Sequence, residues 1–269
     1  MQKNLKHDIP RNIRKKISKL KVLGPTSSYA YGYIQANLVI IDKSFAFDFL
    51  SYSMLNPSPC PILEVLEPGN PFPVKTATNS DIRYDLGKYL IFQNGKSQIV
   101  DNIKNYWTKT KVTFLIGCLF SMQKQFEDSG IYIQHLNDNK IDPTFISNIP
   151  TNTFGIFNGP MIVSMWPIHK NYITKAITIS SRLPSVHGRP IHIGDPALIG
   201  IKDIEKPDYG DIIKLKPDEI PVFWGCGITP QLIAQKKNID MISQINFIPL
   251  TKAEVSKYKI KYKKSISPS

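Results

Sequence analysis

Three short apolar runs, each followed by a turn and a segment with helical spacing, constrain the fold of this chain most strongly. The runs are residues 37–41, 112–118 and 220–224, and the helical segments that follow them are 44–53, 121–128 and 231–236. Short apolar runs are typical of strands that are buried on both faces, as in a parallel sheet covered by helices. The pattern therefore predicts an α/β fold with a mostly parallel or mixed sheet flanked by helices.

The material between the second and third runs has a different character. Residues 143–216 are rich in proline, glycine and threonine, with a strand-like stretch at 161–165 and helical spacing around 170–179. We interpret this part as a smaller α+β subdomain, inserted into a core domain made of residues 1–142 and 217–269. Residues 10–20 are expected to form a short basic helix that starts at a proline, and residues 241–250 a last strand.

Charge and cysteine content limit the classes of partner. The net charge is +13, but eight basic residues lie in 3–21 and six lysines in 252–264, so the centre is closer to neutral. Without a recognisable binding module, nucleic-acid binding is the weaker explanation of this charge. No apolar run is long enough to span a bilayer, so no membrane partner is expected. Three cysteines without metal-ligand spacing favour reduced thiols in the cytoplasm, and an oligomer is left open.

The loop 186–196 concentrates titratable groups among turn-forming glycines and prolines. It carries His187, His192 and Asp195. A histidine–aspartate pair suits proton transfer near neutral pH, so these three are the candidate catalytic residues. In the alternative interpretation, Asp195 caps a turn and the histidines make structural hydrogen bonds. The spacing of the histidines matches no standard zinc pattern, and no metal is expected.

Two strand-to-helix turns provide candidate substrate-binding residues. The turn after the third run contains Gly225, Cys226 and Gly227, followed by Thr229 as the predicted N-cap and Gln231 in the helix. Backbone N–H groups at such a helix start suit a carboxylate, although a plain strand–helix connection explains the same pattern.

The turn after the second run supplies a cysteine and a hydroxyl. Cys118 at a helix start could act as a nucleophile, or could be a small buried apolar residue, and Ser121 lies one turn further on. Arg182 is a candidate clamp for a substrate carboxylate, because a guanidinium can bind it in bidentate fashion.

Seven segments of the chain resemble the D-glutamate cyclase-like family, whose bacterial members are often called hydro-lyases of unknown function. The segments are 32–40, 56–61, 114–118, 159–165, 187–196, 207–211 and 221–231, and they occur in the family's order. The resemblance implies an α/β fold, a small carboxylate substrate and no cofactor. It also implies a carbon–oxygen lyase in amino-acid metabolism, which cyclises D-glutamate to 5-oxo-D-proline with loss of water.

The chain departs from the family pattern at several positions, and two of these departures bear on activity. The family usually has arginine where Trp166 stands, and histidines in the region that here contains Gln244. A catalytically inactive homologue that still binds a small carboxylate is therefore the alternative function.

Overall fold

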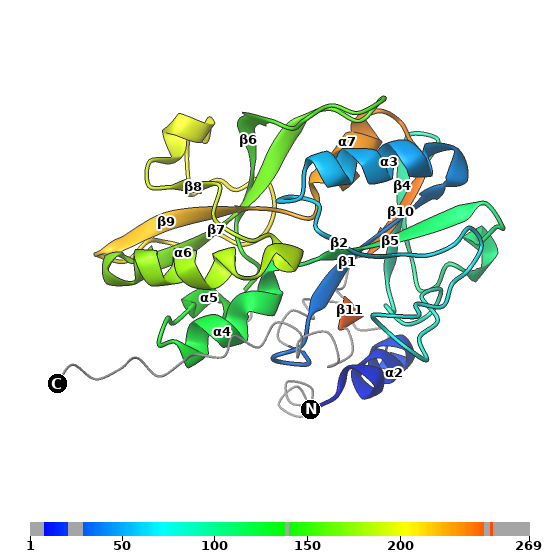
Figure 1. The fold of residues 1–269 in the computed structure, drawn as a ribbon, viewed down its shortest axis with the longest axis horizontal. Coiled ribbons are helices and arrows are strands. Elements are labelled where there is room, and N and C mark those ends of the chain that lie inside the picture. The colour runs from blue at the N-terminus through cyan, green and yellow to red at the C-terminus, as the bar shows by residue number, and fades with distance from the viewer. Residues whose placement is uncertain (1–7, 21–28, 138–139, 245–247, 250–269) are drawn as a thin grey trace.

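The computed structural model describes residues 8–20, 29–137, 140–244 and 248–249, which fold around two β-sheets (Figure 1). The larger sheet contains β1 (Gln35–Asp42), β2 (Ile62–Val65), β3 (Tyr89–Gln93), β4 (Lys96–Val100), β5 (Lys111–Gly117), β10 (Met241–Gln244) and β11 (Ile248–Pro249). The smaller sheet contains β6 (Thr144–Pro150), β7 (Pro160–His169), β8 (His192–Ile193) and β9 (Glu219–Gly225). The strand orders are β2-β5-β1-β10-β3-β4, with β11 beside β1, and β6-β7-β9-β8.

Helices connect and cover these strands. The α-helices are α2 (Pro10–Leu20), α3 (Lys43–Leu55), α4 (Gln123–Asp128), α5 (Gln134–Asn137), α6 (Ile173–Ser181) and α7 (Thr229–Lys236). The short 3₁₀ helices are η1 (Lys104–Tyr106), η2 (Leu119–Met122), η3 (Lys170–Tyr172), η4 (Pro184–Val186) and η5 (Pro196–Ile199). The helix expected at 10–20 and the strands and helices expected from the three apolar runs are present, with boundaries that differ by a few residues.

Strand direction is where the expected sheet is wrong. Every strand pairing among the described residues is antiparallel, including those of β1 with β5 and with β10. The apolar runs are nevertheless buried on both faces, because both faces of the larger sheet are covered and β9 of the smaller sheet contributes Val222 and Phe223 to different apolar clusters. Burial on two sides produces the continuous apolar pattern whatever the direction of the neighbouring strand.

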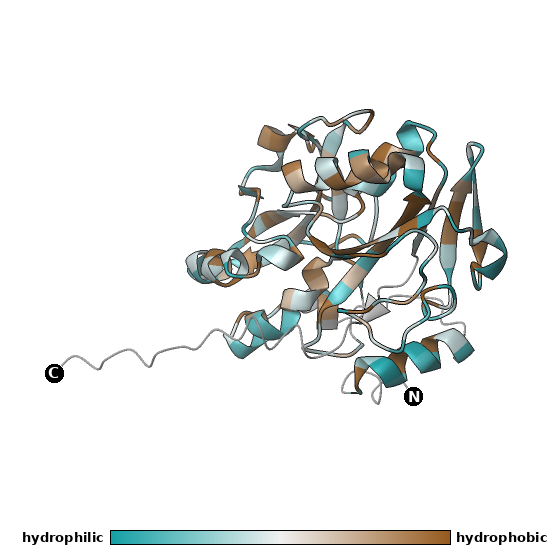
Figure 2. Ribbon diagram, turned by 45° about the vertical axis from the view of Figure 1, so that its right-hand side comes forward, coloured by the Kyte–Doolittle hydropathy of each residue, from teal (hydrophilic) through white to brown (hydrophobic). Residues whose placement is uncertain are grey.

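Two apolar layers enclose the larger sheet. On one face, Val39 and Phe114 pack with Phe49 of α3 and Ile233 of α7. On the other, Leu38 belongs to a cluster that includes Phe126 and Ile179, together with Trp166 and Trp224 of the smaller sheet. Figure 1 shows α3 and α7 together on one side, with α4 and α6 on the other. Figure 2 shows hydrophobic residues along the central strands. The two sheets thus share a core, and their strands end close together.

The proposed division into a core domain and an inserted subdomain stays a prediction. Strands β6, β7 and β8 fall within residues 143–216, whereas β9 lies beyond them and pairs with both β7 and β8.

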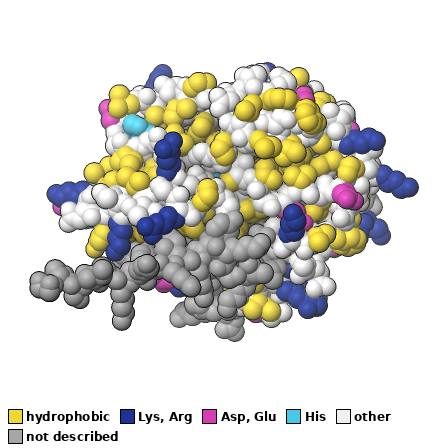
Figure 3. All heavy atoms as spheres, viewed as in Figure 1, with side chains coloured by type: hydrophobic (Ala, Val, Ile, Leu, Met, Phe, Trp, Pro, Cys, Tyr) yellow, Lys and Arg dark blue, Asp and Glu magenta, His cyan; other side chains and the backbone are white. Residues whose placement is uncertain are grey.

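Two features of the described residues bear on membrane and nucleic-acid partners: the length of the apolar helices and the distribution of basic side chains. No helix in the described ranges is both long and apolar enough to cross a bilayer. On the face seen in Figure 3, Lys and Arg side chains are dispersed among apolar and uncharged groups. The C-terminal lysine cluster at 252–264 lies outside the described residues, whereas part of the N-terminal cluster lies on α2.

Glu64 organises a loop beside β2, and its replacement gives a first testable effect. The side chain is 7 % exposed and accepts hydrogen bonds from the backbone N–H groups of residues 74–76 and from the Thr76 hydroxyl. Burial alone would raise its pKa, but these bonds outweigh burial, so the pKa lies below its ordinary value of 4.5. The carboxylate therefore stabilises the fold above pH 4.5, and this contribution is lost as the pH falls through the folded-state pKa.

We expect Glu64→Gln to lower the free energy of unfolding at pH 7 by about 2 kcal/mol, because an amide NH₂ would face backbone donors. The difference from wild type should shrink at pH 3.5. Urea unfolding at both pH values measures it, with the exposed Glu67→Gln as the control. A loss that does not depend on pH would contradict this account.

Candidate active site

A cavity of about 110 Å³ lies where β5 and β9 end beside the segment that leads into β6. Strands of both sheets contribute to its wall, together with five segments outside the strands: 118–120, 141–142, His187, 209–210 and 226–228. The lining carries five titratable side chains and the hydroxyls of Thr144 and Ser164. The titratable residues are Asp142, His187, Cys118, Cys226 and Tyr209. This concentration of titratable groups in one enclosed space makes the cavity the candidate active site.

Two glycines of the turn after β9 are closely packed, and one of them lines the cavity. A Cβ at Gly227, which lines the cavity, would lie 2.2 Å from Nδ2 of Asn37. A Cβ at Gly225 would lie 2.9 Å from the backbone nitrogen of Pro59. A side chain at either position would therefore clash with its neighbours. Neither glycine has a positive φ, so close packing and not backbone conformation is the reason for glycine here.

Asp142 is the titratable group that most distinguishes the cavity. Asp142 is only 5 % exposed, and this burial raises the pKa of its carboxyl group to about 6. The Ser164 hydroxyl and the residue's own backbone favour the ionised form and offset part of this shift. A carboxyl group with this pKa is present in both protonation states near neutral pH, so it can accept a proton and return it.

Asp142 is not among the residues predicted from the sequence, because nothing in its local sequence marks it as buried. Its burial comes from residues far along the chain. Tyr209 and Gly210 line the same cavity, and the carbonyl oxygen of Asp142 lies against Gly210.

His187 forms another part of the wall and is uncharged at neutral pH. Burial lowers its pKa to about 4, although the carbonyl groups of Ser58 and Gly117 favour the protonated ring. Its Nδ1 lies 2.7 Å from the Ser58 carbonyl oxygen, and the Ser58 hydroxyl donates to the His187 carbonyl at 3.3 Å. The proline-rich loop at 56–61 thus fixes the ring in place.

Both cysteines of the cavity are neutral thiols. Burial raises the pKa of Cys226 to about 11 and that of Cys118 well above its ordinary value, and the neighbouring Asp142 raises both further. A nucleophilic cysteine needs the thiolate form, so this environment favours the interpretation of Cys118 as a small buried apolar residue.

The other two candidate catalytic residues lie apart from the cavity wall. His192 is half-buried, with Nε2 2.7 Å from the backbone carbonyl oxygen of Asp195 and its ring beside Phe223. The exposed Asp195 carboxylate accepts from the Ala197 N–H at 2.9 Å, which caps η5. Neither side chain lines the cavity.

The remaining candidate binding residues have structural surroundings. Arg182 is exposed at the end of α6. The Ser121 hydroxyl accepts from the Gln35 N–H at 2.8 Å, and Gln231 is buried with no partner for its Nε2. Thr229 is the first residue of α7, and Ile228 precedes it as the N-cap. The Thr229 hydroxyl does not cap the helix, since it donates to the Cys226 carbonyl at 2.8 Å and accepts from the Ile162 N–H at 3.0 Å. The cavity thus brings together His187, Cys118, Cys226 and Gly227 from the predicted set.

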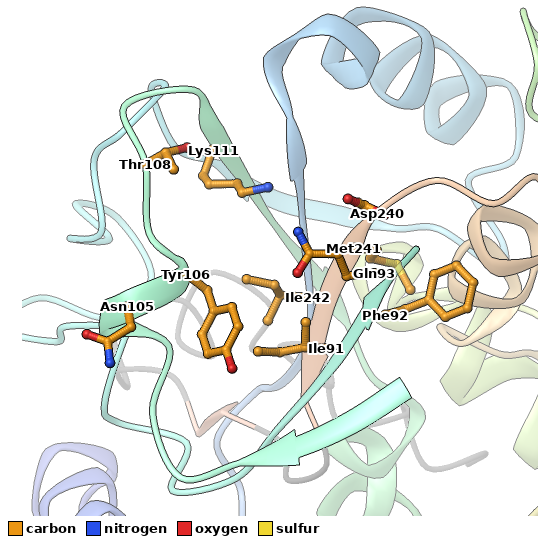
Figure 4. Close-up of a pocket in the computed structure, with 10 residues that line it drawn as sticks. All are labelled: Ile91, Phe92, Gln93, Asn105, Tyr106, Thr108, Lys111, Asp240, Met241 and Ile242. Carbon is orange, nitrogen blue, oxygen red and sulfur yellow. The ribbon is translucent and has the colours of Figure 1, made fainter. Parts of the chain in front are cut away.

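A wider hollow of about 300 Å³ opens beside β3 and β10 (Figure 4). Its floor includes Ile91 and Ile242, and its charged groups are Lys111 and Asp240. None of the residues singled out from the sequence lines it. Among the described residues, no group of three histidine, cysteine or acidic side chains is arranged to hold a metal ion.

The fold is that of a mixed α/β protein with two antiparallel sheets, and the cavity lies where strands of both sheets end. A family model described as D-glutamate cyclase matches residues 112–246. The chain belongs to this family, which confirms the resemblance seen in the sequence.

Similar proteins carry a less specific name. A Thermoanaerobacter protein (strain X514) named "Putative hydro-lyase" is 44 % identical, over 87 % of this chain and 88 % of its own. A Bacillus pumilus protein of the same name is 47 % identical over 83 % and 86 %. The Bacillus subtilis "Putative hydro-lyase YcsI" is 42 % identical over 87 % and 91 %. A nitrogen repressor-like protein from Methanococcus jannaschii aligns with 87 % of this chain and 91 % of its own, at 11 % identity and a TM-score of 0.38, too distant to support an argument.

Trp166 and the region of Gln244 are the positions whose expected departure from the family pattern bears on activity. Trp166 is fully buried in β7, and its ring packs with those of Trp224, Phe126 and His135. Its indole N–H forms no hydrogen bond of normal geometry, but it favours the ionised form of Asp142. The segment 245–247, which follows Gln244, lies outside the described residues.

Proposed function

We propose that this protein is a hydro-lyase that cyclises D-glutamate to 5-oxo-D-proline and water, in the cavity that contains Asp142. The observation that carries the proposal is a buried carboxyl group with a pKa of about 6, in an enclosed cavity of a protein from the D-glutamate cyclase family. A carboxyl group tuned in this way suits general acid–base catalysis near neutral pH.

The chemistry requires proton transfer in both directions. The α-amino nitrogen attacks the γ-carboxyl carbon, the new C–N bond forms, and the C–O bond to the leaving oxygen breaks. Two protons leave the ammonium nitrogen, and both depart on the leaving oxygen as water. One carboxyl group that takes a proton from nitrogen and returns it to oxygen can therefore serve the whole reaction. Asp142 has the position and the pKa for this role.

Other residues of the cavity support the substrate in this proposal. The neutral His187 and the Ser164 hydroxyl offer polar contacts without an added charge. Gly227 lines the cavity, and in this proposal the turn that contains it holds the substrate carboxylate, as the sequence pattern suggests.

A binding protein without catalysis is the second candidate. The observation that favours it is Trp166, which stands where the resembling family usually has arginine, so that β7 supplies no arginine to the cavity. Such a protein would bind a small carboxylate and leave it unchanged.

Turnover and binding separate the two candidates. Purified protein is incubated with D-glutamate or L-glutamate, 5-oxoproline is quantified by chiral chromatography, and the melting temperature is measured with each ligand. We expect product from the D form alone, and an upward shift of the melting temperature. Stabilisation without product would support the inactive homologue, and no response to either compound would contradict both candidates.

A further inference from the structure

Residues 207–211, far along the chain from Asp142, pair with the segment that carries it. The N–H of Thr144 donates to the carbonyl of Tyr209 at 2.9 Å, and the N–H of Tyr209 donates to the carbonyl of Thr144 at 3.1 Å. The N–H of Asp211 donates to the carbonyl of Ile141 at 3.0 Å. The loop therefore forms backbone hydrogen bonds on both sides of Asp142.

Two carboxylates of the loop strengthen this pairing. Asp211 accepts from the N–H of Ile141 at 2.7 Å, and Asp208 accepts from the N–H of Ile146 at 2.8 Å. Charge-assisted hydrogen bonds of this kind are shorter and stronger than neutral ones. The segment around Asp142 is thus held at both of its ends by side chains from one short loop.

Gly210 lies directly against the peptide group of Asp142. A Cβ at Gly210 would lie 2.2 Å from the carbonyl oxygen of Asp142 and 3.0 Å from its carbonyl carbon. The φ of Gly210 is +81°, which also favours glycine. Any side chain at this position would push on the backbone of Asp142.

We propose that residues 207–211 are a positioning element for Asp142, which sets the direction in which its carboxyl group meets the cavity. This inference rests on the proposed function, in which Asp142 transfers the protons. Catalytic groups must be held close to their productive geometry, and a displacement of about 1 Å can cost about 100-fold in rate. The loop acts through Asp142, so its residues are positioning residues.

Gly210→Ala and Gly130→Ala form a matched pair of variants for the test. Gly130 has a φ of +79°, and a Cβ there would meet no atom within 4 Å, so this variant has the same backbone strain without the contact. Two properties are measured: kcat for D-glutamate, and the titration of the Asp142 carboxyl in ligand-free protein by ¹³C NMR. The other titratable groups of the cavity are Cys118, Cys226, His187 and Tyr209.

We expect Gly210→Ala to lower kcat by about 100-fold and to shift the titration of Asp142, whereas Gly130→Ala leaves both as in wild type. A second pair covers the case in which Gly210→Ala does not fold. Asp211→Ala removes the acceptor for the Ile141 N–H, whereas Asp211→Asn keeps an amide oxygen there, so the asparagine should restore the wild-type titration.

The two readouts separate this inference from the proposed function. The titration involves no substrate, so a shifted titration in a protein that never turns over D-glutamate would support positioning and contradict the cyclase proposal. An unshifted titration in Gly210→Ala, or in Asp211→Ala where that pair is used, would overturn positioning even in a fully active enzyme.

Discussion

Asp142→Asn is expected to abolish the cyclisation of D-glutamate and, at the same time, to make the folded protein more stable at neutral pH. An amide cannot take up the proton of the substrate ammonium, so kcat/KM should fall by roughly 10²- to 10⁴-fold. Because Asp142 must be ionised for the first proton transfer, the wild-type kcat/KM should rise with pH up to about 6 and then level off.

Asp142→Asn should increase the free energy of unfolding, because the burial that raises the pKa of Asp142 also opposes its ionisation in the folded protein. Its folded-state pKa of about 6 lies above the ordinary 3.8, so the folded protein binds this proton more tightly than the unfolded chain. This carboxyl group therefore lowers the free energy of unfolding progressively as the pH rises from 3.8 to about 6. Asparagine removes that cost, which is on the order of 3 kcal/mol at most.

Urea unfolding of wild type and Asp142→Asn at pH 4 and pH 8 measures the effect on stability, and the gap should be larger at pH 8. His192→Ala and Asp195→Asn are the activity controls, since neither side chain lines the cavity. If these two variants lost activity while Asp142→Asn kept it, proton transfer would belong to the 186–196 loop instead.

Gly117→Ala is expected to cause the largest loss of stability from a single added methyl group. A Cβ at this last residue of β5 would lie 1.9 Å from the carbonyl oxygen of Ser185 and 2.9 Å from its carbonyl carbon. Both atoms belong to the backbone of η4, so relief requires a shift of the segment that leads to His187. Overpacking of this kind costs about 3 kcal/mol, which corresponds to a fall of roughly 10 °C in melting temperature for a protein of this size.

Gly159→Ala is the matched control for this substitution. A Cβ there would lie 2.9 Å from Cγ1 of the buried Ile233, so the contact is with one side chain and not with a backbone carbonyl. The control should therefore lose much less stability in the same thermal melt. Equal losses in the two variants would show that the backbone contact at Ser185 is not what makes Gly117 necessary.

Local pattern predicted the elements of the fold better than their arrangement. The helix at 10–20 and the strand cores at 37–41 and 220–224 follow from apolar spacing, which local sequence records. Whether neighbouring strands are parallel or antiparallel depends on the path of the chain between them. The continuous apolar runs did not reveal this direction, because burial on both faces gives the same pattern in either case. The β3–β4 hairpin was also missed, although its turn is Asn94-Gly95, with both residues at positive φ, the strongest short-range signal for a hairpin.

The candidate site shows the same division between local and long-range information. Titratable residues clustered in the 186–196 loop drew attention to His187, which does line the cavity. His192 and Asp195 are close, but the contact is to a backbone carbonyl, a detail that spacing does not contain. Asp142 gained its raised pKa from burial beneath a loop about 65 residues further on, and no local pattern could indicate that.

The position of β10 has a consequence for the order of events during synthesis. This strand lies between β1 and β3 in the middle of the larger sheet, although it is made after nearly all of the others. Until the ribosome has released residues 241–244, β1 and β3 each present an unpaired edge. Exposed strand edges can pair with other chains, so we expect the growing polypeptide to be most prone to aggregation before β10 is made.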